Sequence, residues 1–220
     1  MEVGRMMFME QYFPDLGDSV KLKGIIEYHY KQTSDFFTDK SSTHSYDEIY
    51  DIILKPYADK AGHMLEIGVH MGGSLLVWQD YFSKMKITGL DDNPIVPNSI
   101  LKKYNSDRID YQIGNAYSKK IFNELMKKNP HGFDIIIDDG SHILDDQLKF
   151  IDLYLKTVRK GGLLVIEDVQ STINISKLIK RIHDVLDPHF GSNYQIHIYD
   201  HSGSTTKRYD DVMLVVNIAP

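Results

Sequence analysis

The stretch FDIIIDDGSH, residues 133–142, decides the expected fold of this chain, because an apolar run passes directly into two acids, a glycine and a histidine. Short apolar runs that end in this way are typical of buried parallel strands, which are covered on both faces and carry chemistry at their carboxyl ends. The same pattern recurs on either side of it, at residues 64–68, 86–90 and 163–166. We therefore predict a mostly parallel sheet.

Segments with helical spacing alternate with these apolar runs. They cover residues 46–57, 74–82, 118–127, 143–158 and 173–186. Strands that alternate with helices predict an α/β layered domain with helices on both faces of the sheet.

The two ends of the chain complete this prediction. Residues 194–199 and 212–217 alternate or run apolar, and we expect them to close a seven-stranded sheet as an antiparallel pair. Residues 1–43 lack a clear period, so we expect them to form a lid or an oligomer contact with a second copy of the chain. Residues 44–220 are then the main domain.

Composition narrows the class of protein. A chain of 220 residues with 42% hydrophobic and 25% charged residues is typical of one globular domain. A formal net charge of -6 argues against nucleic acid as a partner, since phosphate backbones bind clustered cations. The absence of cysteine excludes disulfides, thiolate metal sites and a cysteine nucleophile. No stretch approaches the ~20 apolar residues of a membrane span, so we expect a cytoplasmic protein without a membrane partner.

Glycines and acids follow the first three strands, where open parallel sheets bind ligands. The first strand leads into EIGVHMGGS at residues 66–74, whose glycines let the backbone approach a ligand, although their spacing is not that of dinucleotide-binding proteins. Asp91 ends the second strand and suits a ribose with free hydroxyls. A third strand, 109–113, ends in a Gly-Asn-Ala turn suited to an adenine edge. The alternative is that these glycines only form turns and the acids only cap helices.

Four carboxylates and a histidine follow the fourth and fifth strands. Asp138 and Asp139 end one strand, and Glu167 and Asp168 end the other. Adjacent strands would bring them to one rim, where a cation is the simplest way to keep all of them ionised. An all-oxygen set suits Mg²⁺. His142 is placed to accept a proton from a hydroxyl there, and the alternative is an ordinary surface histidine.

Together these motifs resemble the metal-dependent sugar O-methyltransferases of macrolide biosynthesis, the mycinamicin and macrocin type. The matching stretches are TDKSSTHSY at 38–46, LEIG at 65–68, GGSL at 72–75, WQDYF at 78–82, FDIIIDDGSH at 133–142 and GGLLVIEDVQ at 161–170. The resemblance implies a Rossmann-like class I methyltransferase fold with S-adenosylmethionine and Mg²⁺. It also implies an acceptor hydroxyl on a sugar, carried by a nucleotide, a polysaccharide precursor or a glycosylated natural product.

The resemblance also implies residue roles. His142 would be the general base, and Asp139, Glu167 and Asp168 would bind Mg²⁺. The residues implied for S-adenosylmethionine are Lys40, Ser41, Tyr46, Glu66, Gly68, Ser74, Asp91, Asn115, Ala116 and Asp138. The acceptor candidates are His44, His201, Lys207 and Arg208, of which the last three belong to a polar loop that equally suits a solvated hairpin.

Other functions share parts of this pattern. A phenolic or catechol-like acceptor fits the same metal chemistry, and 14 tyrosines and 9 phenylalanines do not exclude it. A nicotinamide-dependent oxidoreductase would share the sheet and Asp91, but residues 68–74 lack its phosphate-binding spacing. A non-catalytic sugar-binding protein would have little use for His142 beside a full acidic set.

Overall fold

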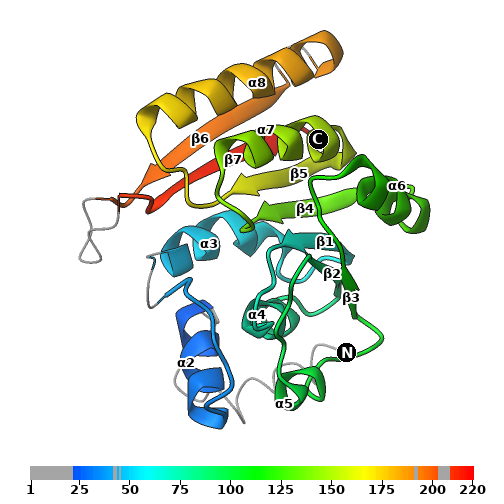
Figure 1. Cartoon of the computed structure of the whole chain (residues 1–220), viewed down its shortest axis with the longest axis vertical. Helices are drawn as coiled ribbons and strands as arrows, with labels where there is room; N and C mark the ends of the chain where they lie inside the picture. The colour runs from blue at the N-terminus through cyan, green and yellow to red at the C-terminus, as the bar shows by residue number, and fades with distance from the viewer. Residues whose placement is uncertain (1–21, 42–43, 45, 191–192, 203–208) are drawn as a thin grey trace.

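A seven-stranded sheet in the order β3-β2-β1-β4-β5-β7-β6 forms the centre of the molecule (Figure 1). The computed structural model describes residues 22–41, 44, 46–190, 193–202 and 209–220. The strands are β1 (Gly62–Ile67), β2 (Met85–Asp91), β3 (Ile109–Ile113), β4 (Phe133–Asp138), β5 (Val158–Ile166), β6 (Tyr194–Asp200) and β7 (Val212–Ile218). β1 to β5 pair in parallel, and β7 pairs antiparallel with both β5 and β6. The predicted sheet and its antiparallel C-terminal pair are confirmed.

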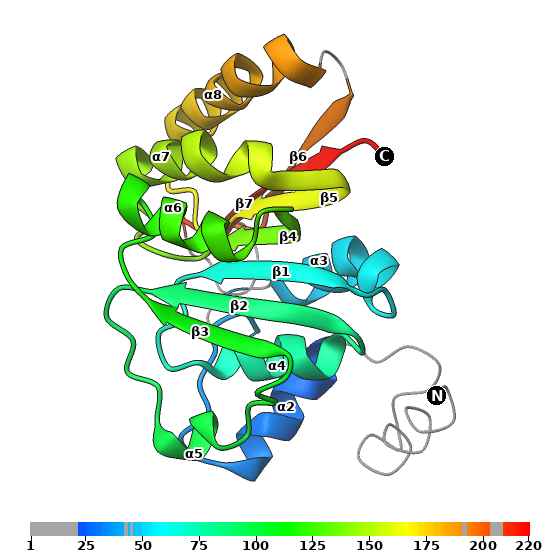
Figure 2. The same cartoon turned by 90° about the vertical axis from the view of Figure 1, so that its right-hand side faces the viewer.

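Helices cover both faces of this sheet (Figure 2). One face carries α2 (Leu22–Gln32), α3 (Tyr46–Leu54), α4 (Gly73–Tyr81) and α5 (Asn98–Leu101), and the other carries α6 (Lys119–Lys128), α7 (Leu144–Tyr154) and α8 (Thr172–Phe190). The 3₁₀ helices η1 (Lys55–Tyr57) and η2 (Leu155–Thr157) follow α3 and α7. Because successive side chains of a strand point to opposite faces, Val165 of β5 packs into the first core and Leu164 into the second. Continuous apolar strands thus serve two cores.

Helix α2 was not predicted from the sequence. Leu22, Ile25 and Ile26 are buried where α2 packs against α3 and α4. His29 continues the same face, and its Nε2 lies 2.9 Å from Asp80 Oδ2 of α4. These positions follow the i, i+3, i+4, i+7 spacing of an amphipathic helix, so the signal was present in the sequence. Residues 22–32 are therefore part of the packed body, and their role as a lid or oligomer contact stays a prediction.

The predicted helix at 143–158 is too long. α7 ends at Tyr154, and after η2 the chain enters β5 at Val158, which pairs with Phe133 of β4.

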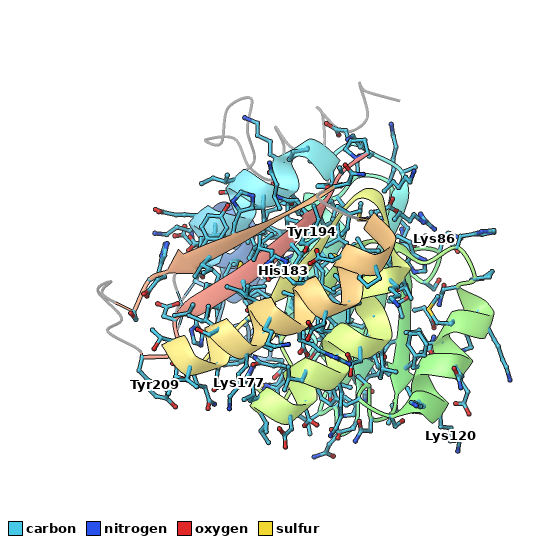
Figure 3. The ribbon with its side chains drawn as sticks, turned by 90° about the horizontal axis from the view of Figure 1, so that it is seen from above. Lys86, Lys120, Lys177, His183, Tyr194 and Tyr209 are labelled. Carbon is cyan, nitrogen blue, oxygen red and sulfur yellow. The ribbon has the colours of Figure 1, made fainter. Side chains whose placement is uncertain are left out.

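At the β6 edge of the sheet, α8 packs against α7, and His183 of α8 contacts Tyr194 of β6 (Figure 3).

Among the helices of the described residues, none has both the length and the apolar character needed to cross a membrane.

The strand order reverses at β1, which lies between β2 and β4. In an open parallel sheet the connections on the two sides of such a point diverge, and a crevice opens beyond the carboxyl ends of the strands. Gly68, Asp91 and Asp139 directly follow or end these three strands. The fold therefore brings the predicted site residues to one edge of the sheet.

Candidate functional site

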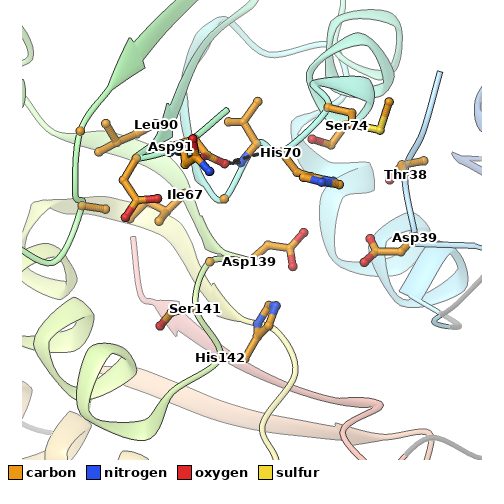
Figure 4. Close-up of a pocket in the computed structure, with 18 of the residues that line it drawn as sticks. Thr38, Asp39, Ile67, His70, Ser74, Leu90, Asp91, Asp139, Ser141 and His142 are labelled. Carbon is orange, nitrogen blue, oxygen red and sulfur yellow. Dashed lines mark hydrogen bonds between the residues drawn. The ribbon is translucent and has the colours of Figure 1, made fainter. Parts of the chain in front are cut away.

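A cavity of about 390 Å³ opens at this edge. It is lined by Phe37, Thr38, Asp39, Ile67, Gly68, Val69, His70, Met71, Ser74, Leu90, Asp91, Asp92, Asn93, Gly114, Ala116, Tyr117, Asp139, Gly140, Ser141 and His142. Asp39 comes from the segment before α3, whereas Asp139 and His142 share the loop between β4 and α7, and all three face the same space (Figure 4). Its volume lies within the range of small-molecule pockets, and its walls combine apolar side chains with a comparable share of polar and charged ones.

Gly68 makes the close approach between the β1 and β4 loops possible. Its φ is +85°, and a Cβ atom there would lie 1.8 Å from the carbonyl oxygen of Asp139. The amide of Gly68 donates to Leu90 O at 2.9 Å, and the amide of Asp139 donates to Ile67 O at 2.9 Å. The glycine is therefore required by both conformation and space, and Asp139 reaches the cavity because of it.

Asp91 organises the turn after β1. Its Oδ2 accepts the backbone N–H groups of Val69 and His70, each at 2.7 Å, and its Oδ1 accepts that of Asn93 at 2.8 Å. These charge-assisted bonds hold the turn and leave the carboxylate at the cavity wall. Asp91 thus combines a structural role with the position predicted for ribose binding.

The turn after β3 places only part of its predicted residues at the cavity. Ala116 lines it, whereas the Asn115 side chain accepts the N–H of Tyr117 at 2.9 Å and is exposed. Tyr117, which was not predicted, lines the cavity and donates from its hydroxyl to Asp138 Oδ1 at 2.8 Å. Burial, opposed by this hydrogen bond, raises the pKa of Asp138 to about 7. The sequence did hold a signal for Tyr117, because it is an aromatic residue directly after the turn predicted to bind adenine.

Lys40 lies among buried carboxylates next to the cavity. We call these carboxylates the acidic centre, and they belong to Glu66, Asp139, Glu167 and Asp168. Its Nζ donates to Asp139 Oδ2 at 2.6 Å and to Glu167 Oε1 at 2.9 Å, and it lies 3.6 Å from Glu66 Oε1. Burial disfavours the charge on Lys40, but these three carboxylates and that of Asp39 outweigh it and raise its pKa. Tyr50 also donates to Glu167 Oε1. Glu167 thus already has two partners within the protein.

Glu66 has a buried position inside β1 that needs a partner. Ser74 Oγ of α4 donates to its Oε2 at 2.7 Å. Burial raises the pKa of Glu66, while the Lys40 charge and the Ser74 hydrogen bond oppose that shift. Glu66 therefore faces Lys40 and Ser74. Of these three residues, Ser74 lines the cavity, whereas Glu66 and Lys40 do not.

Asp168 forms the other half of the acidic centre. It adopts a positive φ of 54°, and its Oδ1 accepts the Tyr46 hydroxyl at 2.7 Å. His44 Nδ1 lies 3.4 Å from both Asp168 Oδ1 and Asp211 Oδ1, and the His44 ring stacks on that of Tyr46. Tyr46 and His44 therefore contact the acidic centre and do not line the cavity.

His142 lies between the acidic centre and the cavity. Its Nε2 is 3.5 Å from Asp168 Oδ2, and its φ is 56°. Burial lowers the pKa of His142 and outweighs the attraction of Asp168. Asp139, His142 and Asp168 each offer one ligand atom, and these atoms lie within 4.8 Å of one another. This grouping contains two of the predicted metal ligands and the predicted base.

The remaining predicted residues are more peripheral or cannot be placed. Ser41 is half-buried beside Lys40 and does not line the cavity. The amide of His201 donates to the carbonyl oxygen of Asp211 at 2.8 Å. Lys207 and Arg208 lie outside the described residues.

Comparison with known proteins gives a consistent family. The family model described as O-methyltransferase matches residues 22–176. Demethylmacrocin O-methyltransferase of Streptomyces fradiae is 35% identical over 146 residues, 62% of this chain and 35% of the relative. The Streptomyces olivaceus protein named 8-demethyl-8-alpha-L-rhamnosyl tetracenomycin-C 2'-O-methyltransferase is 29% identical over 143 residues, 61% of this chain and 36% of that one. The matched region spans about a third of these relatives.

A solved structure shares the fold. The MycE methyltransferase of the mycinamycin biosynthetic pathway, solved in complex with Mg and SAH, superposes with a TM-score of 0.67 at 22% identity. The match covers 91% of this chain and 55% of that one. At this identity the likeness establishes the class I methyltransferase fold.

Proposed function

The chain belongs to the O-methyltransferase family, and from that premise we propose that it transfers the methyl group of S-adenosylmethionine to a sugar hydroxyl, with the help of Mg²⁺. One observation carries the proposal. A cavity at the reversal point of the strand order ends on Asp139 and His142, so a ligand held by the sheet edge would face a cation centre and a base.

The cavity suits S-adenosylmethionine in shape and chemistry. Ile67, Leu90 and Ala116 supply apolar surface for the adenine, and the Asp91 carboxylate at the wall suits the two ribose hydroxyls. Gly68 lets the backbone of Asp139 and Gly140 pack directly against the β1 turn, so that both loops border the cavity. This chain would bind and orient the cofactor so that its methyl group faces the Asp139 end of the cavity.

The acidic centre suits a divalent cation. Asp139 and Asp168 each offer an oxygen to the grouping of possible ligand atoms that lie within 4.8 Å of one another. Glu167 is not in that grouping. Its contacts with Lys40 and Tyr50 use only Oε1, so its second carboxylate oxygen is left for a ligand bond. We propose Asp139, Glu167 and Asp168 as the residues that hold Mg²⁺. When bound, the ion would supply a Lewis acid that lowers the pKa of the acceptor hydroxyl.

His142 is proposed as the general base. Since burial lowers its pKa, the imidazole is neutral near pH 7 and able to accept a proton. The acceptor oxygen would form a bond to the methyl carbon while the carbon–sulfur bond breaks and its electron pair stays on sulfur. His142 would take the hydroxyl proton, and S-adenosylhomocysteine would leave. Asp168, 3.5 Å from His142 Nε2, would stabilise the resulting imidazolium.

A sugar acceptor is supported by the relatives. One of them is named for methylation at the 2' position of a rhamnosyl compound. Three groups contact Asp168 or Asp211 and would frame the acceptor: His44, Tyr46 and the amide of His201. The carrier of the sugar is to be identified by a substrate panel.

Calorimetry and turnover together test the proposal. We expect S-adenosylhomocysteine to bind and NAD not to bind, and the opposite result would refute the methyltransferase assignment. Turnover is measured as S-adenosylhomocysteine formation with nucleotide sugars, glycosylated natural products and catechol as acceptors. EDTA should stop turnover, and added Mg²⁺ should restore it.

Replacement of the base is the sharper test. His142→Ala should lower kcat by at least about 100-fold, the usual scale of general base catalysis, while S-adenosylhomocysteine affinity changes little. His183→Ala, a surface histidine of α8, is the matched control and should keep wild-type turnover. Normal turnover in His142→Ala would remove His142 from the mechanism.

A further inference from the structure

Lys40 brings a buried positive charge into a centre otherwise built of carboxylates. Its side chain is 1% exposed, and Nζ lies within 3.6 Å of carboxylate oxygens on Asp139, Glu167 and Glu66. These acids come from the ends of three different strands, β4, β5 and β1. Because an ammonium has three N–H donors and water does not reach it here, the contact is fixed and weakly screened.

The same residue fixes the wall of the cavity. Residues 37–39, which line the cavity, directly precede Lys40. The Lys40 carbonyl accepts the N–H of Tyr46 at 3.1 Å and that of Asp47 at 3.2 Å, at the start of α3. Upstream, Thr38 O accepts the Tyr30 hydroxyl at 2.7 Å. The wall is therefore tied to the sheet by the Lys40 side chain and to α3 by its backbone.

Charge counting gives Lys40 a role toward a divalent cation. Four carboxylates, those of Glu66, Asp139, Glu167 and Asp168, and one ammonium leave a net charge of minus three when all are ionised, and the nearby Asp39 carboxylate adds to the negative charge. A hard divalent ion such as Mg²⁺ binds well with one or two carboxylates and keeps waters elsewhere. Without Lys40, an extra unneutralised negative charge would lie within a few ångströms of the ion. Even at an effective dielectric of about 20, one unit charge at that range changes affinity by more than about tenfold.

We propose that Lys40 is a positioning residue that acts as a built-in counter-charge of the cation centre. Its ammonium balances Glu66 and shares Asp139 and Glu167 with the divalent ion, so that the ion binds reversibly and not as a permanent structural metal. The same contact ties residues 37–39 to the centre and thereby supports cofactor binding. The inference rests on the proposed function for the presence of a cation.

The test separates charge from tethering. Lys40→Met removes the positive charge, Glu66→Gln removes a negative charge, and the double variant restores the wild-type net charge without the tether. Lys180→Met, which removes an exposed lysine paired with Asp184 on α8, is the control for loss of a surface charge. Mn²⁺ affinity, by calorimetry and by electron paramagnetic resonance, and S-adenosylhomocysteine affinity, by calorimetry, are measured on all five proteins.

The two affinities should respond differently. Mn²⁺ should bind Lys40→Met at least about tenfold more tightly than wild type, Glu66→Gln at least about tenfold more weakly, and the double variant and Lys180→Met within about threefold of wild type. S-adenosylhomocysteine should bind at least about threefold more weakly to both proteins that lack Lys40. Folding is checked by thermal unfolding. If Lys40→Met does not fold, the double variant is compared with Glu66→Gln, and it should bind Mn²⁺ more tightly.

The contradicting outcomes are distinct. Unchanged or weaker Mn²⁺ binding by folded Lys40→Met, or by the double variant relative to Glu66→Gln, would overturn the counter-charge inference and leave the proposed function intact. Wild-type protein that binds S-adenosylhomocysteine but no Mn²⁺ at millimolar concentration would overturn the cation centre and this inference together.

Discussion

Gly68→Ala is the perturbation whose effect the structure defines most sharply. At φ +85° an alanine is strained by about 1–2 kcal/mol. In addition, its Cβ would lie 1.8 Å from the carbonyl oxygen and 2.4 Å from the carbonyl carbon of Asp139, which are backbone atoms. The β1 and β4 loops must therefore separate by more than an ångström, at a further cost of about 1–3 kcal/mol.

Gly161→Ala supplies a matched control. Its φ is +74°, but the nearest atoms to an added Cβ belong to Pro220 at 3.9 and 4.0 Å, which is ordinary contact. This variant should show only the conformational strain. Since 1 kcal/mol shifts Tm by about 2–4 °C in a domain of this size, Gly68→Ala should melt about 2–12 °C below Gly161→Ala.

Thermal unfolding and calorimetry decide the outcome. Gly68→Ala should also lose S-adenosylhomocysteine affinity by at least about tenfold, because Asp139 and the turn at 68–74 border the same cavity. Gly161→Ala should bind normally. Equal melting temperatures and equal affinities for the two variants would refute the claim that close approach at Gly68 builds the site.

Two further predictions follow from single contacts. Asp91→Asn should weaken S-adenosylhomocysteine binding by at least about tenfold, because an amide has one acceptor oxygen where the carboxylate uses both on backbone N–H groups. Asp145→Asn, at an exposed position of α7 outside the cavity lining, is the control, and calorimetry showing equal losses would contradict this reasoning. Burial, with Arg159 and Lys86 nearby, lowers the pKa of His63 to about 4 from an unfolded value near 6.5, so the unfolded chain binds the proton first and stability falls as pH drops from about 6.5 to 4. After allowance for partial exposure, His63→Gln should remove about 1–2 kcal/mol of that loss. If the free energies of unfolding of wild type and His63→Gln, measured in urea, differ by the same amount at pH 7 and at pH 4.5, that result would count against this prediction.

The strand framework was predictable because its signal is local. Residues 135–137 are apolar on both faces, and burial in two cores requires just that. The parallel strands followed from their alternation with helices, and the antiparallel pair followed from the apolar segments at residues 194–199 and 212–217, whereas the order of the strands in the sheet was not predicted. Helix α2 also has a local signal, the amphipathic spacing of Leu22, Ile25, Ile26 and His29, so it could have been predicted from the sequence.

The contacts of the site were not predictable in the same way. Lys40 stands in the polar segment TDKSSTHSY, which gives no sign that its ammonium is buried among three carboxylates. Its nearest partners, Asp139 and Glu167, are 99 and 127 residues away along the chain. Tyr50 similarly looked like one more residue of an amphipathic helix, and only packing brings its hydroxyl to Glu167.

By itself, the sequence determined the α/β class, the acids at the strand ends and the motif FDIIIDDGSH, because hydrophobic periodicity and residue chemistry are properties of neighbouring positions. Tertiary structure alone decided which of these acids share a centre, that a lysine lies among them, and that His142 lies beside Asp168. Those facts depend on distances between segments remote in the chain, and such distances are set by the packing of the whole sheet and its helices.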